Sequence, residues 1–163
     1  MEDTVKELGH LALGTRLKRL GDRLQTQTQT LLEEVGVPVP ASHLPPLAAL
    51  GRGGAMTVGE LSRTLGVTQP GVTRMSAALE RAGLVRSGEA EGDRRARVLT
   101  LTPAGRRLLA DLERRTFPRI EAAVREACGE VPGTLLMNLA ALEEALEREP
   151  LAARTLRLPN GER

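Results

Sequence analysis

The sequence predicts a mainly α-helical fold with one small β wing, and three observations support this. Two short amphipathic patterns, each starting with a helix-capping residue, follow one another between Thr57 and Gly83. Two short apolar runs then enclose a polar, glycine-containing stretch within residues 84–101, which is typical of a β-hairpin. Leucines recur every three or four residues near both ends of the chain, which indicates long helices with a narrow apolar face.

The N-terminal pattern, from Val5 to Val35, is predicted to form one long helix. Its apolar seam consists of Leu13, Leu17, Leu20, Leu24, Leu31 and Val35. The alternating glutamines and threonines of residues 25–30 interrupt this seam. We interpret them as a stretch of exposed helix rather than as the polar wall of a ligand cleft, because helix propensity alone is a weak guide.

A linker at residues 36–42 and a second helix are expected next. Pro45 and Pro46 have no N–H to donate, so this helix begins near Leu44 and runs to about Leu50. Glycines at 51, 53 and 54 end it, and a short strand follows at residues 55–56.

Two capped helices are predicted from Thr57 onward. Thr57 and Glu60 form a capping box, and Gly66 supplies the left-handed residue that ends the first helix. Thr68 is a second N-cap, and Pro70 lies in the first turn of the helix that stops at Gly83. Two short helices joined in this way make a helix-turn-helix.

The exposed face of the second helix is the first candidate site. Val72, Met75 and Leu79 mark the buried face, so the opposite face carries Pro70, Thr73, Arg74, Ala77 and Arg81. This strip has two arginines and no acid, and it suits a DNA major groove, with residues near its N-terminal end reaching bases or phosphates. The alternative is an ordinary solvated helix face.

The hairpin is the second candidate site. Leu84–Arg86 and Arg97–Leu101 are predicted strands, joined by a polar loop at residues 87–96 that stands away as a wing. Arg94 and Arg95 are expected at or near its tip, where arginine inserts into a narrow minor groove. We expect Asp93 to orient a guanidinium rather than to contact DNA.

These elements together resemble the MarR family of winged helix-turn-helix transcription regulators. The resemblance covers about Met56 to Arg107, and its most specific part is the Asp93-Arg94-Arg95 wing leading into Leu99-Thr100-Leu101-Thr102-Pro103-Ala104-Gly105. It implies a homodimer that binds a pseudo-palindromic operator, usually as a repressor relieved by a small ligand. Pro70-Gly71 departs from the family, which often has Ser or Thr there.

The helix-turn-helix, the wing and the resemblance together give one set of expected DNA contacts. The set is Thr68, Gln69, Pro70, Gly71, Thr73, Arg74, Ala77, Arg81, Arg94, Arg95 and Arg97.

Two more helices and a tail are predicted after the hairpin. Thr102 caps a helix that Pro118 should kink, and after a break at 129–133 a last helix carries Leu135, Leu139, Leu142 and Leu146. Residues 150–163 show no period. The chain is therefore divided into a winged helix-turn-helix domain at 43–107, flanking helical regions at 1–36 and 108–149, and a tail.

The two leucine seams predict a homodimer. With one phenylalanine and neither Trp nor Tyr, the chain has little with which to cover both seams itself. Pairing the first and last helices of two subunits buries them at ~25 cal/mol per Å² of apolar area. The reading helices would then lie about one DNA turn apart.

Charge is concentrated on the proposed DNA-binding part. The whole chain has a net charge of +2, but residues 60–107 carry nine arginines and five acids, a net charge of +4. Residues 108–149 have a net charge of −4. This distribution favours a chain that presents one end to phosphate.

Other functional classes fit the sequence less well. His10 and His43 have no nucleophile or acid at a recognisable spacing, and no phosphate-binding glycine loop occurs, so we expect neither an enzyme nor a cofactor or metal. Cys128 is the only cysteine, and we expect it to be a small buried residue. The alternatives are a winged helix that binds protein instead of DNA, and a metal or small-molecule site at His10 and His43.

A small anionic effector and a cytoplasmic location complete the expectations. By the resemblance, an effector would bind between the winged-helix lobe and the dimer helices, near Arg16, Arg19, Arg23 and His43. The N-terminal segment is acidic and lacks a long apolar run, so neither a secretory signal nor a membrane span is expected.

Overall fold

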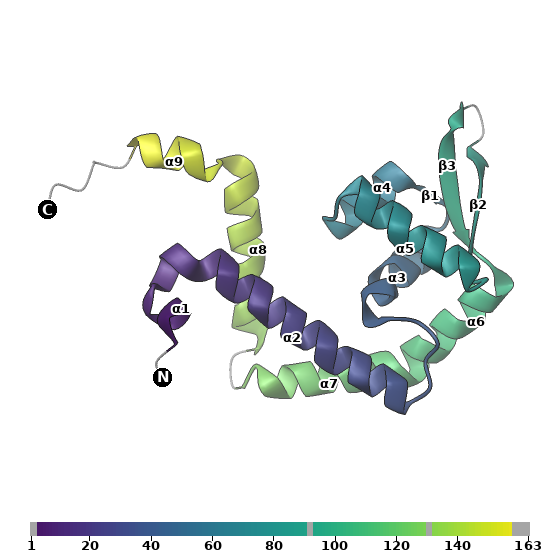
Figure 1. The fold of residues 1–163 in the computed structure, drawn as a ribbon, viewed down its shortest axis with the longest axis horizontal. Coiled ribbons are helices and arrows are strands. Elements are labelled where there is room, and N and C mark those ends of the chain that lie inside the picture. The colour runs from purple at the N-terminus through teal and green to yellow at the C-terminus, as the bar shows by residue number, and fades with distance from the viewer. Residues whose placement is uncertain (1–2, 91–92, 130–131, 158–163) are drawn as a thin grey trace, which may run out of the picture. The chain divides into compact units, whose positions relative to one another are not determined.

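The computed structural model describes residues 3–90, 93–129 and 132–157, with the backbone alone at 89, 90, 93–96 and 132 (Figure 1). It divides into two compact units, Met1–Phe117 and Pro118–Arg163, which are described separately below.

The N-terminal segment is three helical pieces rather than the one long helix predicted. These are α1 (Thr4–Glu7), the 3₁₀ turn η1 (Gly9–Ala12) and α2 (Leu13–Glu34). Gly9 has φ +53°, a left-handed conformation that ends α1 and that periodicity does not reveal. The Arg19 side chain bonds Asp3, with Nη2 to Oδ2 at 2.7 Å, which holds α1 against α2.

The polar repeat of residues 25–30 is helical and largely exposed, as predicted. Its threonines remain compatible with the helix because their hydroxyls donate to backbone carbonyls one turn earlier. Thr26 Oγ1 donates to the carbonyl of Asp22 at 2.9 Å. Gln29 has a structural role, since its Oε1 accepts from the backbone N–H of Ala41 at 2.8 Å and so fixes the linker to α2.

The helix-turn-helix is preceded by η2 (Ala41–His43), α3 (Leu44–Gly53) and β1 (Met56–Thr57). Helix α3 starts at Leu44 as predicted but runs three residues past Leu50. It ends only where Gly54 takes φ +74°.

Helices α4 (Val58–Leu65) and α5 (Gln69–Arg81) begin and end at the predicted residues. Thr57 and Glu60 form both halves of the capping box, and Gly66 is left-handed at φ +63°. Thr68 accepts from the backbone N–H of Gly71, and the chain turns after α5 at Gly83, with φ +70°.

The hairpin strands are longer than the sequence pattern indicated. β2 (Val85–Ala90) and β3 (Asp93–Leu101) form an antiparallel ladder, and the sheet order is β1-β3-β2. The predicted loop at 87–96 is therefore mostly strand, with Glu89 opposite Arg97 and Ala90 opposite Asp93. The expectation was wrong because period-two alternation appears only where one face of a strand is buried, and a projecting ribbon has no such face.

The core of this unit lies where α3, α4, α5 and the base of the hairpin meet. Leu47, Leu61, Val72, Leu79 and Leu99 are each at most 2% exposed. Full burial of such side chains contributes about 1.5–3 kcal/mol each relative to leaving them in water. This core fixes the rotation of α5.

After the hairpin the chain forms α6 (Pro103–Asp111), a π-helical segment η3 (Leu112–Thr116) and α7 (Phe117–Ala127). A kink was predicted at Pro118, and the irregularity lies in the turn just before it. Pro118 has no N–H to offer the carbonyl of Arg114, and a widened turn accommodates that missing bond.

The second unit contains α8 (Pro132–Arg148) and α9 (Leu151–Arg157) after Gly129, which has φ +70°. Helix α9 lies in the C-terminal segment, whose sequence shows no period. Residues 151–157 are therefore helical, although the sequence pattern indicated an irregular tail. The Glu149 carboxylate accepts from Arg157 Nη2, and Arg154 Nε donates to the Glu149 carbonyl at 3.0 Å. These contacts start a seven-residue helix that is too short to give a pattern. Cys128 is half-buried, not buried as expected.

Many leucines of the two seams are exposed. On α2 these are Leu17, Leu20 and Leu24, and on α8 they are Leu135 and Leu146. None of the helices in the described ranges combines the length and apolar character that a membrane crossing needs.

Candidate nucleic-acid interface

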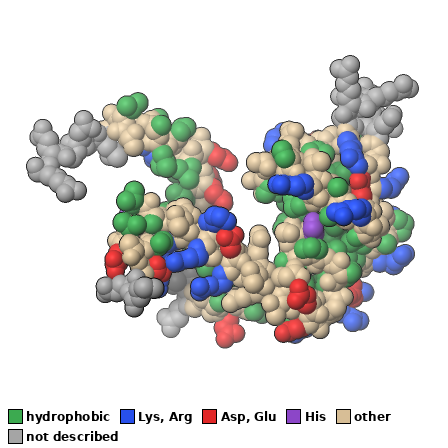
Figure 2. Space-filling view, in the orientation of Figure 1, with side chains coloured by type: hydrophobic (Ala, Val, Ile, Leu, Met, Phe, Trp, Pro, Cys, Tyr) green, Lys and Arg blue, Asp and Glu red, His purple; other side chains and the backbone are tan. Residues whose placement is uncertain are grey.

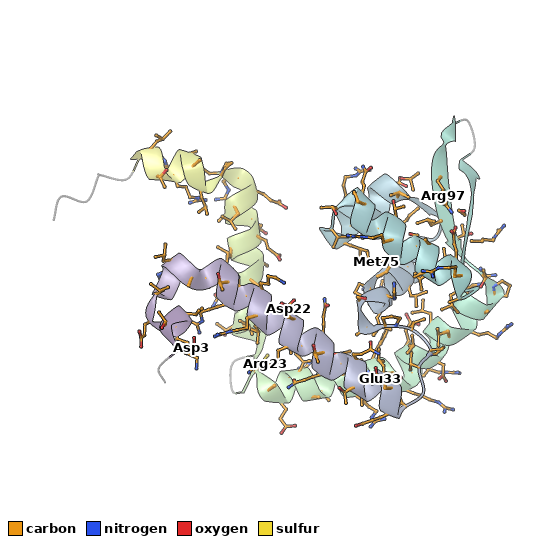
Figure 3. The ribbon with its side chains drawn as sticks, in the orientation of Figure 1. Asp3, Asp22, Arg23, Glu33, Met75 and Arg97 are labelled. Atoms are coloured by element: carbon orange, nitrogen blue, oxygen red, sulfur yellow. The ribbon has the colours of Figure 1, made fainter. Side chains whose placement is uncertain are left out.

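Helix α5 presents the predicted face to solvent. Val72, Ser76 and Leu79 are buried. Met75, which is labelled in Figure 3, is half-buried on the same helix. The predicted outward strip, Pro70, Thr73, Arg74, Ala77 and Arg81, is exposed at every position. The strip projects away from the core that α3 and α4 provide.

The start of α5 uses hydroxyls for its own backbone. Thr68 Oγ1 accepts from Gly71 N at 3.3 Å, and Thr73 Oγ1 donates to the Gln69 carbonyl at 2.9 Å. A phosphate oxygen only accepts hydrogen bonds, so Thr73 could donate to one only by giving up this internal bond. Its methyl group remains on the exposed strip and suits contact with the methyl of thymine.

Gly71 replaces a side chain that the resemblance led us to expect. A Cβ at this position would lie 3.3 Å from Thr68 Oγ1, so the two atoms would have to separate by a few tenths of an ångström. Gly71 itself has no side chain, so no hydroxyl from this position can reach DNA.

Arg74 and Arg81 are the cations of the exposed strip. Neither takes part in an ion pair between described residues. Arg81 Nε donates to the Ala77 carbonyl at 3.3 Å, which orients its guanidinium along the helix. Both can therefore offer their positive charge to an external anion.

Arg97 differs from these two because it is already paired. Its Nη2 lies 2.7 Å from Oε2 and 2.9 Å from Oε1 of Glu80, at the C-terminal end of α5. Figure 3 shows Arg97 where the hairpin passes this helix. Sequence reasoning placed Arg97 among the DNA contacts and assigned no role to Glu80, since the pair joins residues 17 positions apart.

Arg94 and Arg95 lie on β3 close to the end of the hairpin, so their backbone agrees with a place near the tip. Their side chains, like that of Asp93, are outside the described set. The predicted minor-groove contacts of the wing therefore stay predictions.

The Thr102-Pro103-Ala104-Gly105 stretch attaches the hairpin to α6. The Thr102 N–H donates to the Leu84 carbonyl at 2.9 Å, and its hydroxyl donates to the Gly83 carbonyl at 2.7 Å. A Cβ on Gly105 would lie 2.0 Å from the Leu84 carbonyl oxygen, so only glycine fits. The part of the sequence pattern from Thr102 to Gly105 thus has a structural reason and need not touch DNA.

The charge of this region is accessible. Figure 2 shows basic side chains, all of them arginines, spread over the surface of α4, α5 and the base of the hairpin. With the net charge of +4 over residues 60–107, this surface suits a polyanion.

The predicted ligand residues are only partly brought together. Arg16, Arg19 and Arg23 line one groove of about 440 Å³ on α1 and α2, together with Asp3 and Lys6. Arg19 is paired with Asp3, which lowers the pKa of that carboxyl chiefly through the hydrogen bond between them. His43 does not line this groove.

The two histidines are in different surroundings. His10 is exposed on η1, whereas His43 is half-buried beside α3, and burial lowers the pKa of its imidazole. His43 Nδ1 is buried and has no hydrogen-bond partner among the described atoms. Within the described ranges, no group of three or more His, Cys, Asp or Glu side chains could hold a metal ion.

Solved structures with this fold include several proteins bound to DNA. The transcriptional repressor CouR, solved on a 23-mer DNA duplex, is 27% identical with a TM-score of 0.68, over 84% of this chain and 96% of CouR. A mutant of MarR from E. coli complexed with operator DNA is 20% identical with a TM-score of 0.68, over 89% and 99% of the two chains.

A third similar structure concerns regulation by a small molecule. It is BpsR from Bordetella bronchiseptica, whose DNA binding is regulated by 6-hydroxynicotinic acid. BpsR is 20% identical with a TM-score of 0.68, over 81% of this chain and 92% of BpsR. No curated protein sequence matches the chain.

The sequence model of the MarR family matches residues 36–96, which run from the linker before α3 into β3. The match covers the capped helices and most of the hairpin described above. That part of the chain is therefore similar to the MarR family, and the solved structures share its winged helix-turn-helix fold.

Proposed function

We propose that this protein regulates transcription as a homodimer that binds double-stranded DNA in a sequence-specific way. The observation that supports this most directly is the exposed strip of α5, which carries Arg74 and Arg81, no acid, and small side chains between them. Such a strip approaches a major groove without steric or electrostatic penalty. Regulation, rather than catalysis, is the role that this surface supports.

The roles within the strip differ. Arg74, one turn into α5, is placed to reach a base edge, and Thr73 offers its methyl group beside it. Arg81, at the far end of the helix, is placed for phosphate. Arg94 and Arg95 on the hairpin are proposed to reach the minor groove next to it.

The exposed leucines of α2 and α8 support the homodimer. A second copy of the chain is the partner that we expect to cover these leucines, because its own α2 and α8 carry the same apolar seams. The two-fold axis of such a dimer also matches the symmetry of a pseudo-palindromic operator. Leu20→Glu on α2 should therefore shift the protein to monomers in light scattering and abolish operator binding. Leu11→Glu is the matched control, since Leu11 is 85% exposed and lies outside the predicted seam.

Repression relieved by an anion is the finer part of the proposal. The groove lined by Arg16, Arg19 and Arg23 has the charge for a small carboxylate. BpsR shows that a protein of this fold can be regulated by such a compound. A panel of small carboxylates should weaken operator binding by the wild type, and Arg16→Ala with Arg23→Ala should remove that response.

The competing function is a winged helix that binds a protein partner. The accessible arginines of α5 favour DNA, and salt dependence separates the two. A dimer that contacts phosphates loses affinity as a power of the salt concentration, with a log–log slope of about −0.9 for each phosphate neutralised.

Selection of bound sequences from a random duplex pool tests the proposal. The wild type should enrich one pseudo-palindromic duplex, and Arg74→Ala should weaken binding and relax its sequence preference. Arg125→Ala is the control, because it removes the same charge from α7, where Arg125 pairs with Glu121. No enrichment, or an Arg74→Ala variant that selects the same duplex as tightly, would refute DNA reading by α5.

A further inference from the structure

The Glu80–Arg97 ion pair connects the reading helix to the hairpin. Arg97 lies on the same face of β3 as Leu99 and Leu101, because alternate residues of a strand share a face. Leu99 and Leu101 are buried in the core, and Arg97 continues their row one step further toward the tip. The ion pair thus extends the contact between hairpin and α5 beyond the apolar core.

The geometry of the pair leaves Arg97 able to bind something else. Both Glu80 oxygens accept from a single guanidinium nitrogen, Nη2. The Arg97 side chain is 53% exposed, whereas that of Glu80 is 22% exposed. Glu80 is therefore the shielded anchor, and Arg97 keeps N–H groups toward solvent.

The pair also affects the charge of the surface. Glu80 carries a negative charge at the edge of a surface otherwise suited to phosphate, where an acid opposes DNA binding. Without Arg97 the helix would lose nothing by having Gln in its place, because the C-terminal end of a helix disfavours an acid. Its presence is explained if it holds Arg97 and, with it, the angle between the hairpin and α5.

We propose that Glu80 is a positioning residue for specificity: it orients Arg97 and the hairpin for the operator and offsets one cation that would otherwise strengthen binding to any duplex. This inference rests on the proposed function of DNA binding. We therefore expect Glu80 to raise the ratio of operator affinity to non-operator affinity, although Glu80 lowers the affinity for DNA in general.

Two variants of Glu80 distinguish the effect of its negative charge from the effect of its side-chain length. The probes are the duplex that wild type selects and a shuffled duplex of equal length and composition. In Glu80→Gln, removing the carboxylate that offsets the charge of Arg97 in both subunits should steepen the salt slope on the shuffled duplex by about 1.8. Its affinity for that duplex should then fall ~12-fold more than that of wild type between 50 and 200 mM salt. The ratio of operator affinity to shuffled-duplex affinity should fall at low salt, because the shuffled duplex gains a cation contact while the operator loses the orientation that Glu80 gives Arg97.

Glu80→Asp keeps the charge but is one methylene shorter. It should leave the salt slope as in wild type and still lower the ratio, because the shorter side chain does not hold Arg97. Arg97→Gln should weaken binding to both duplexes and make the slope shallower. Glu113→Gln, the same charge change on exposed η3, is the control and should alter neither slope nor ratio.

A purely structural role for the pair would lower the stability of the variants without moving the salt slope, so urea denaturation is measured alongside. If wild type enriches a duplex but Glu80→Gln matches Glu113→Gln in slope and ratio, this inference is wrong and the proposed function stands. If wild type enriches no duplex, the proposed function fails and takes this inference with it.

Discussion

Gly105→Ala tests the junction between the hairpin and α6. In most helices, replacing Gly by Ala stabilises a protein by about 0.5–1 kcal/mol. Here the new Cβ would lie 2.0 Å from the Leu84 carbonyl oxygen, and ordinary contact starts at 3.4 Å, so α6 must move by about 1.4 Å. The obstacle is backbone, which cannot rotate away as a side chain can.

That movement would disturb the two bonds from Thr102 to the carbonyls of Gly83 and Leu84. Overpacking costs about 1–3 kcal/mol and each weakened hydrogen bond about 0.5–1.5 kcal/mol, so we expect a net loss of about 2–5 kcal/mol. The urea midpoint, measured at one fixed protein concentration, should fall by about 1–2 M.

Gly21→Ala is the matched control for this substitution. Gly21 lies in α2 with nothing within 4 Å of an added Cβ, so the same substitution should raise the midpoint slightly. A Gly105→Ala variant as stable as wild type, or one that changes in the same direction as Gly21→Ala, would refute the close-approach argument.

Three further predictions concern the same unit. Hydrogen bonds from the backbone N–H of Thr57 and then from its hydroxyl lower the pKa of Glu60, and such a shift stabilises the fold only while the carboxyl is ionised. Wild type should therefore lose stability relative to Glu60→Gln as the pH falls below 4.5. Parallel acid-unfolding curves of the two proteins would contradict this. Burial lowers the pKa of His43, so below pH 6.5 the unfolded chain binds a proton more readily than the folded chain, and acidification from neutral pH should destabilise wild type more than His43→Gln in thermal unfolding. Leu47 is fully buried, and Leu47→Ala should lower the free energy of unfolding, measured in urea, by about 2–5 kcal/mol. A loss under about 1 kcal/mol would show that α3 is not part of the core.

The helix-turn-helix could be predicted from the sequence because its signals are local. Thr57, Gly66 and Thr68 each act on backbone groups within a few residues, so caps and turns can be read directly from the chain. The 3.6-residue period then fixed which side of α5 is buried, and with it the exposure of Arg74. The predicted DNA-facing strip follows from these two facts alone.

Where the sequence misled, the signal was weak or absent. The left-handed Gly9 that divides the N-terminal helix looks like any other glycine in a helical pattern. The outer hairpin strands have no buried face to impose alternation, and α9 is too short to show a period. Each error concerns a segment without a one-sided apolar environment.

Only the tertiary structure decided which arginines of the site are accessible. In the sequence, Arg74, Arg81 and Arg97 are equivalent cations, but folding brings Glu80 to Arg97 across 17 residues and leaves the other two without an acid among the described residues. The same holds for Gly105, whose need for glycine comes from the Leu84 carbonyl of another element. Local chemistry determines the elements, whereas charge pairing and close packing depend on distances that exist only after they are assembled.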